Sequence, residues 1–303
     1  MINTPILFIV YNRPKLTKES FAAIRKVKPK YLYIAADGPR VYKPGEKETC
    51  KEVRDLVAKI DWPCTLKRLY RRKNLGCKKA VSSAIDWFFD NVKEGIILED
   101  DCLPNTSFFK FCEYMLENYK NDKRIMHIGG NNFQSTPDKF DNGYYFSKYP
   151  HIWGWATWRR AWKCFDVKID NWPKIKKTRI LDKYWSTFWE KNYWKAILDL
   201  TYLGKFDAWG YQWLYAIWLN GGISITPGVN LVRNIGFGQN STHFSNNDAR
   251  YDVRPEKMKF PLAQPKEIVA NIKFDKHTFV NNYMHDPLTV IALRIRSFKE
   301  RFL

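Results

Sequence analysis

The sequence predicts an α/β protein with a mostly parallel central sheet and helices on both faces. In the first 100 residues, apolar runs that suit buried strands alternate with segments of helical periodicity, as in a parallel sheet with right-handed crossovers. Polar residues recur where those strands end, and in an open α/β sheet such ends form a ligand-binding edge. A chain of 303 residues is also long enough to bury a large core.

The first part of the chain supplies four predicted strands, each followed by a predicted helix. The strands cover residues 5–10, 30–36, 64–69 and 96–98. The helices cover residues 18–26, 47–60, 77–91 and 108–119. Helical spacing of apolar side chains, as in Val53, Leu56 and Val57, supports these assignments. Thr17 is the expected N-cap of the first helix.

Three consecutive acids, Glu99, Asp100 and Asp101, directly follow the fourth predicted strand. Carboxylates this close repel one another unless a cation lies among them, and a divalent cation with phosphate ligands prefers oxygen donors of this kind. The alternative is a solvated acidic turn. Because the acids abut a buried strand, we favour the cation site.

Further polar residues follow the other strands, namely Asn12 and Arg13, Asp37, and Asn74 to Gly76. Turns favour Asp, Asn and Gly in any case, so each position alone is a weak signal. Together they predict a nucleotide site along one edge of the sheet. The chain has neither a GxGxxG motif nor a Walker A loop, which argues against a dinucleotide site and a P-loop NTPase.

In the second part of the chain, the segments with a recognisable strand or helix pattern are shorter. Short strands are expected at 124–128 and within 223–232, and helices at 159–165, within 166–200 and from 206–213 to Asn220. Gly154, between two tryptophans, would allow close backbone approach to a ligand. Asp207 is expected near the start of its helix, where the helix dipole favours a carboxylate, and a plain N-cap role is the alternative.

Residues 234–243 form a Gly-rich, polar loop whose backbone N–H groups and hydroxyls suit phosphate. His243 in this loop is a candidate contact to phosphate or metal, although a lone His is more often structural. Residues 245–285 are expected to be irregular and to wrap back over the domain. Residues 287–303 predict a basic amphipathic helix, which would either lie on an anionic bilayer or dock on the protein.

Composition narrows the functional classes. A net charge of +20 favours an anionic partner, and 17% aromatic residues suit either sugar sites or core packing. The six cysteines have no CxxC spacing and no zinc-like cluster, so free thiols in a reducing compartment are expected. No positive leader region and no apolar stretch near ~20 residues is present, which predicts neither a signal peptide nor a transmembrane helix.

The order of these motifs resembles that of the GT-A glycosyltransferases, most closely the N-acetylglucosaminyltransferase I group and its bacterial relatives. The matching stretches are residues 11–14, 37–38, 74–76, 97–104, 108–109, 154–155, 206–209 and 237–243. The resemblance implies a GT-A fold with a Rossmann-like sheet over residues 1–245, divided into a nucleotide-sugar half (1–130) and an acceptor half (131–245). Residues 246–303 would form a C-terminal extension.

The resemblance also implies an inverting, metal-dependent transfer of a sugar from a nucleotide-diphosphate sugar to a glycan hydroxyl. The donor would be a UDP-sugar such as UDP-N-acetylglucosamine. Asp101 would ligate Mn²⁺ or Mg²⁺, and Glu99 and Asp100 would hold the donor sugar and ribose. Asp37 would read the uracil, and Asp207 would be the catalytic base, with Ala208 where the family often has a second acid. The other expected substrate contacts are Asn12, Arg13, Asn74, Gly76, Gly154, Trp155, Trp209, Ser241 and His243.

Two alternatives remain open at this point. Charge and aromatic content also suit a nucleic-acid-binding protein or a metal-dependent nuclease, but no nucleic-acid module is present, so no nucleic-acid partner is expected. A non-catalytic protein of the same fold is less consistent with the acid set. The expected acceptor is a bacterial surface polysaccharide or lipopolysaccharide. The expected location is the cytoplasm, with peripheral attachment to the inner face of the membrane left open.

Overall fold

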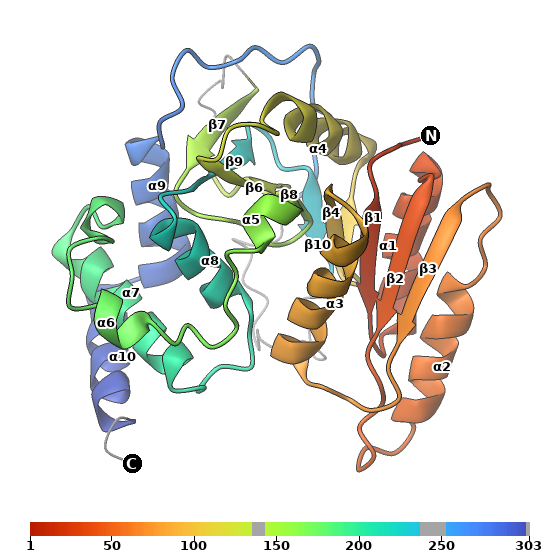
Figure 1. Cartoon of the computed structure of the whole chain (residues 1–303), viewed down its shortest axis with the longest axis horizontal. Coiled ribbons are helices and arrows are strands. Elements are labelled where there is room, and N and C mark those ends of the chain that lie inside the picture. The colour runs from red at the N-terminus through yellow and green to blue at the C-terminus, as the bar shows by residue number, and fades with distance from the viewer. Residues whose placement is uncertain (135–142, 237–252, 301–303) are drawn as a thin grey trace.

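A mixed sheet of eight strands, flanked by helices, runs through the molecule (Figure 1). This computed structural model describes residues 1–134, 143–236 and 253–300. The strand order is β3 (Thr65–Tyr70), β2 (Tyr31–Ala36), β1 (Ile6–Val10), β4 (Glu94–Glu99), β8 (Trp155–Trp158), β6 (Ile125–Gly129), β9 (Ile223–Pro227) and β7 (Tyr144–Ser147). The first four strands are parallel, whereas β8 is antiparallel to β4 and β6. The predicted α/β class is confirmed, with four parallel strands from the first part of the chain and a further parallel pair, β6 with β9.

Both faces of the sheet are buried along β1, β2 and β4, as expected for strands this apolar, whereas the edge strand β3 is partly exposed. Along β1, Ile6 and Phe8 belong to one core cluster and Leu7 and Ile9 to the other, because successive side chains point to opposite faces. The first cluster is covered by α1 (Pro14–Val27), α2 (Glu46–Val57) and α4 (Thr106–Asn118). The second is covered by α3 (Cys77–Asn91), α5 (Arg159–Trp162), α6 (Trp172–Ile175), α7 (Phe188–Tyr202) and α8 (Gly210–Leu219), with the 3₁₀ turn η1 (Asp182–Tyr184).

Two details differ from the prediction, one after β1 and one after β4. Thr17 is not the cap of α1: the helix starts at Pro14, with Arg13 at the N-cap position, and the Thr17 hydroxyl donates to the Arg13 carbonyl at 2.8 Å. Proline suits the first helical turn because its fixed φ matches the helix and its missing N–H would have no partner there. A short strand that was not predicted, β5 (Cys102–Pro104), follows the acids and pairs antiparallel with β10 (Val232–Asn234).

The C-terminal segment is part of the fold. It wraps back as predicted, with the Met258 N–H donating to the Ser107 hydroxyl at 3.2 Å and the Tyr114 hydroxyl to the Leu262 carbonyl at 3.2 Å. The prediction that it is irregular up to residue 285 is wrong, because α9 (Ile272–Thr278) and the π-helical η3 (Phe279–Met284) lie there. The closing helix is confirmed as α10 (Pro287–Lys299), which packs beside α7 at the edge of the molecule (Figure 1).

The predicted division into halves does not interrupt the sheet, since β4 of the first half pairs with β8 of the second. The expected boundary at residue 245 lies outside the described residues. All six cysteines are free thiols, as predicted. Across the described parts of the chain, no helix combines the length and apolar character needed to cross a bilayer.

Candidate active site

The carboxyl ends of the four parallel strands meet at one edge of the sheet, at the bottom of Figure 1. This topology brings together the predicted polar residues that follow β1, β2, β3 and β4. Side-chain hydrogen bonds link them in pairs across gaps of tens of residues, as described below. The predicted clustering at this edge is therefore confirmed by the fold.

Arg13 lies among the acids that follow β4. Its guanidinium donates to Asp100, and its Nη2 atom lies 3.0 Å from Oδ2 of Asp101. The Asp100 side chain is only 3% exposed and also accepts from the Tyr11 N–H at 3.3 Å. A buried carboxylate needs a partner of opposite charge or several hydrogen-bond donors. The cation that the three acids require is, in this structure, supplied by the protein itself.

Glu99 differs from its two neighbours in its protonation. Burial, together with the charges of Asp101 and Asp100, raises the pKa of Glu99 to about 8. At neutral pH its carboxyl is therefore mostly protonated and able to donate a hydrogen bond. A cation placed beside it would lower this pKa and favour the carboxylate.

Asp101 is the acid best suited to a metal ion. Its side chain is 17% exposed, and among the described residues its second oxygen, Oδ1, accepts only from the Cys102 thiol, at 3.6 Å. Within the described residues, no group of three His, Cys, Asp or Glu side chains forms a cage. Mg²⁺ is commonly held by one or two carboxylates, with phosphate and water oxygens as its other ligands, so Asp101 could serve as such a carboxylate.

The ribbon of β5 and β10 brings a second segment against Asp101. The Ile235 N–H donates to the Asp101 carbonyl at 2.8 Å. A Cβ atom on Gly236 would lie 2.6 Å from Asp101 Oδ2, so a larger residue there would displace the Asp101 carboxylate. The predicted phosphate loop follows directly, but its residues Ser241 and His243 lie outside the described part of the chain. The loop thus departs from a point beside the proposed metal ligand.

Asp37 organises the turn after β3. Its carboxylate accepts from the Asn74 amide at 2.9 Å, from the Leu75 N–H at 3.0 Å and from its neighbour Gly38 N–H at 2.9 Å. Burial raises its pKa, and these hydrogen bonds oppose the rise. Asp37 and Asn74 are therefore brought together as predicted. In this structure the Asp37 carboxylate positions the turn, and its contact with a uracil base stays a prediction.

Asp207 caps a helix other than its own. α8 begins at Gly210, whereas the Asp207 carboxylate accepts from the backbone N–H groups of Cys77 at 3.0 Å and Lys78 at 2.9 Å, at the start of α3. Gly76 precedes that helix with φ +78°, and a Cβ atom there would approach Asp207 Oδ2 to 3.0 Å. The expected cap of its own helix is wrong; the capped helix is about 130 residues away in sequence.

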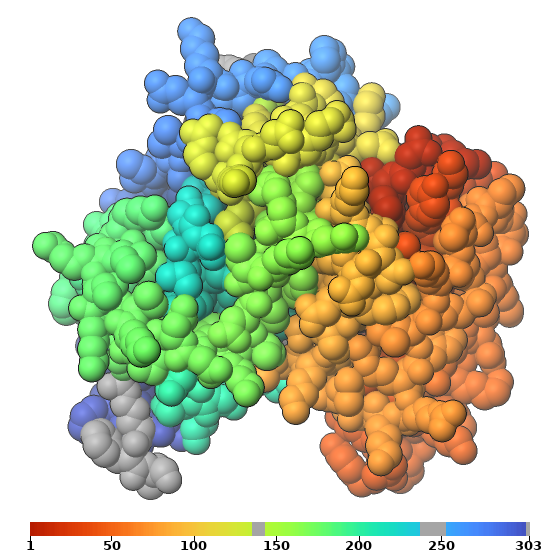
Figure 2. Space-filling model, viewed as in Figure 1, coloured from red at the N-terminus to blue at the C-terminus, as the bar shows by residue number. Residues whose placement is uncertain are grey.

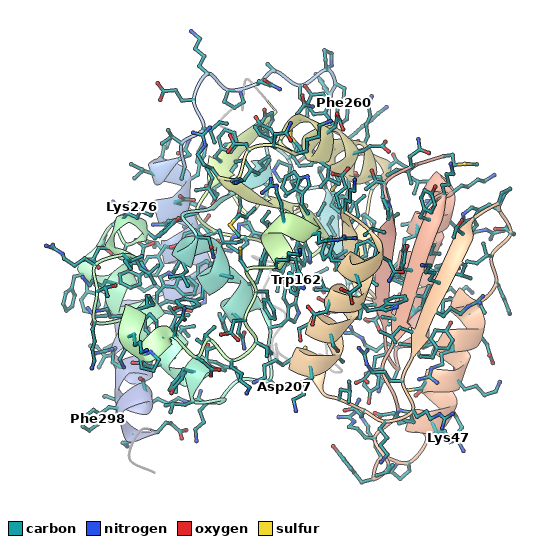
Figure 3. The ribbon with its side chains drawn as sticks, in the orientation of Figure 1. Lys47, Trp162, Asp207, Phe260, Lys276 and Phe298 are labelled. Atoms are coloured by element: carbon teal, nitrogen blue, oxygen red, sulfur yellow. The ribbon has the colours of Figure 1, made fainter. Side chains whose placement is uncertain are left out.

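The charges of Asp207 and of the acids after β4 both act on the thiol of Cys77. Burial, then the charges of Glu99, Asp207 and Asp101, raise the pKa of its thiol to about 12. Asp207 contacts the start of α3 directly, and the charges of Glu99 and Asp101 also act on the Cys77 thiol at that helix start. Figure 3 shows Asp207 at the lower end of α3, and in Figure 2 the outline is indented there, between the orange N-terminal part and the green and teal part.

A buried glutamate that the sequence reasoning missed supports the β1 end of the site. Glu46 accepts from the Asn12 amide at 2.9 Å, from the Tyr11 hydroxyl at 2.5 Å and from the Arg40 N–H at 2.7 Å. Its side chain is 1% exposed, and the hydrogen bond from Arg40 leads the causes that lower its pKa to about 2. Asn12 is thus held in place by Glu46. The sequence feature that could have indicated this role is an acid in the first turn of the second helix.

Three predicted substrate contacts lie in the core. Trp155 is 1% exposed and Trp209 is 3% exposed, and their rings stack with centroids 5.5 Å apart. Gly154 faces Val232, whose Cγ2 would be 2.9 Å from an added Cβ, so close packing and not a ligand requires the glycine here. The same aromatic cluster includes His127, whose imidazole accepts from the Trp213 indole at 3.2 Å. In this conformation both tryptophan rings pack the interior.

No protein-family model matches the chain, and no curated protein sequence matches it. Among solved structures, HddC from Yersinia pseudotuberculosis is 11% identical over 57% of this chain and 86% of its own length, with a TM-score of 0.34. A UDP-glucose pyrophosphorylase complexed with UDP-glucose is 12% identical over 54% of this chain and 79% of its own, with a TM-score of 0.31. A 4-diphosphocytidyl-2C-methyl-D-erythritol synthase from Anaerococcus prevotii is 8% identical over 52% of this chain and 72% of its own length, with a TM-score of 0.33. Scores this low assign neither a family nor an activity.

Proposed function

We propose that this protein is an inverting, metal-dependent glycosyltransferase that moves a sugar from a UDP-sugar to a hydroxyl of a glycan acceptor. The observation that carries the proposal is the convergence of Asp207 with the acids after β4 around the start of α3. For direct transfer a general base and a phosphate-binding edge must be neighbours, because the acceptor oxygen attacks the carbon that the diphosphate leaves.

The donor diphosphate would bind at the carboxyl edge of the sheet. Asp101 would hold Mn²⁺ or Mg²⁺, which offsets the charge that builds on the leaving diphosphate. Arg13 pairs with Asp100 and Asp101 and is positioned to share a charge-assisted hydrogen bond with a phosphate oxygen. The basic residues Arg71 to Lys73 flank the turn that Asp37 holds, which favours an anionic ligand.

Glu99 and Asp207 would act on the sugar and the acceptor. With a metal ion bound beside it, Glu99 would be a carboxylate and would accept a hydrogen bond from a sugar hydroxyl. Asp207 would take the proton from the acceptor hydroxyl as the new C–O bond forms and the bond to the diphosphate breaks, with inversion at the anomeric carbon. Its carboxylate accepts two backbone N–H groups and retains lone pairs for a third donor.

The proposal is tested by thermal unfolding with a panel of nucleotide-diphosphate sugars, each with Mn²⁺ or with a chelator. A ligand at about 100 times its dissociation constant should stabilise the fold by roughly 2.7 kcal/mol. We expect stabilisation by UDP-sugars only with the metal, and transfer of the sugar to a glycan acceptor such as a lipopolysaccharide core. Tight, salt-sensitive binding of RNA or DNA, with no response to any nucleotide sugar, would instead support the nuclease alternative.

A further inference from the structure

Helix α10 has an inner apolar face that packs on the protein and an outer apolar face that is largely exposed. Val290, Leu293 and Ser297 lie on the inner face, where Val290 is 2% exposed and the Ser297 hydroxyl donates to Asp199 of α7 at 3.3 Å. An ion pair of 2.5 Å between Glu300 and Lys205 fixes the end of the helix. The helix is therefore docked, as one of the two sequence alternatives predicted.

The opposite face of α10 carries large apolar side chains that are open to solvent. Leu288, Ile291, Ile295 and Phe298 are 72%, 45%, 52% and 64% exposed. Their spacing of three, four and three residues places them in one stripe along the helix, because each residue turns the helix by about 100°. Figure 3 shows Phe298 at the outer edge of the molecule. Docking on α7 therefore leaves an amphipathic surface facing outward.

Positive charge borders this stripe on both sides. On the helical wheel, Arg294 lies on one side of the stripe and Arg296 and Lys299 lie on the other, and all three are exposed. No acid occurs between Pro287 and Lys299, and the whole chain carries a net charge of +20. The surface thus combines an apolar strip with flanking cations.

We infer that the outer face of α10 binds an anionic lipid surface. In an interfacial helix of this kind the apolar strip enters the boundary between headgroups and acyl chains, and the flanking cations meet the lipid phosphates. A second copy of the chain fits less well: two such faces would oppose like charges, and four side chains bury far less than the roughly 800 Å² per partner of a stable dimer. This inference does not depend on the proposed enzymatic activity.

Co-sedimentation with lipid vesicles tests the inference on the full chain. The vesicles are phosphatidylcholine alone, or phosphatidylcholine with one third phosphatidylglycerol. We compare wild type with an apolar variant (L288S, I291S, I295S and F298S), a charge variant (R294Q, R296Q and K299Q) and the matched control Val41→Ser. Val41 is 96% exposed in the turn between β2 and α2, on the other side of the molecule. Because every changed residue is exposed, circular dichroism should confirm that all variants fold.

Wild type and Val41→Ser should bind the anionic vesicles and not the neutral ones. Each Lys or Arg near such a surface contributes roughly fivefold to partitioning, so the charge variant should bind roughly a hundredfold more weakly. The apolar variant should lose binding even at low salt. Equal binding by the apolar variant and wild type would overturn the inference, as would failure of wild type to bind. A wild-type dimer that the apolar variant abolishes would assign the face to a second copy.

Discussion

Asp207 both caps α3 and is the proposed general base, and two substitutions separate these roles. Asp207→Ala removes the acceptor of the Cys77 and Lys78 N–H groups, which lie 3.0 and 2.9 Å from its oxygens. Loss of such a cap costs about 1–2 kcal/mol. Asp207→Asn keeps one oxygen acceptor, replaces the other with an amide donor that cannot accept from a backbone N–H, and loses the charge at the helix start, so it should also cost about 1–2 kcal/mol.

Catalysis should respond differently from stability. A general base contributes roughly 10²- to 10⁴-fold to the rate, so both variants should lose at least a hundredfold in kcat. Urea unfolding would measure the free energy, and single-turnover transfer to an acceptor in solution would measure the rate. The control is Asp286→Asn, because Asp286 caps α10 by accepting the Thr289 N–H at 3.0 Å and is remote from the acids.

The comparison of Asp207→Asn with Asp286→Asn decides the role. If Asp207→Asn turns over at the wild-type rate while its stability falls, the carboxylate is only a helix cap and the base lies elsewhere. If kcat falls in proportion to the loss of folded protein, the effect is structural. Only a large loss of kcat in a folded variant, with donor binding retained, fits the proposed base.

Three further predictions follow from the contacts described above. Arg13→Ala leaves Asp100 buried and unpaired and should lower the free energy of unfolding by about 3 kcal/mol at neutral pH, with Arg13→Lys partly restoring it in urea titrations. Asp37→Ala removes the acceptor of the Asn74 and Leu75 donors, so it should cost about 1–3 kcal/mol and weaken nucleotide binding in calorimetry, whereas Asp122→Ala at an exposed turn should leave nucleotide affinity unchanged. Burial lowers the pKa of His127 to about 3, so the neutral imidazole contributes stability above its ordinary pKa near 6.5 that is lost as pH falls toward 3. His127→Asn should therefore lose less stability on acidification than wild type, and an equal loss would show that other groups control acid unfolding.

The local pattern of the first part of the chain was enough to predict its architecture. Apolar runs alternating with helical periodicity gave β1 to β4 and α1 to α4, and the helix over Cys77–Asn91 was predicted to the residue. The missed strands are short and depend on distant partners: β5 pairs with β10 across more than 100 residues, and β8 joins two strands far from it in sequence. No local periodicity reports such pairings.

The sequence predicted which residues lie at the candidate site better than it predicted the contacts that they make. The polar residues at the strand ends were found because parallel strands place their carboxyl ends together. Two of these contacts depend on tertiary structure alone: Arg13 pairs with Asp100, and Asp207 caps a helix in another part of the chain. Trp155 and Trp209 were expected to contact the substrate because of the family resemblance, but tryptophan rings also fill cores, and here they do.

The central claim is that Asp101 makes donor binding depend on a divalent cation. The most direct test is calorimetric titration of UDP into wild type and Asp101→Asn, with Mn²⁺ and with a chelator. Asparagine keeps the size of the side chain and removes the charged ligand. We expect Mn²⁺ to tighten UDP binding by at least about tenfold in wild type, which is roughly 1.4 kcal/mol, and to have no effect in the variant. Equal, Mn²⁺-dependent affinity in the two proteins would contradict the proposed metal site.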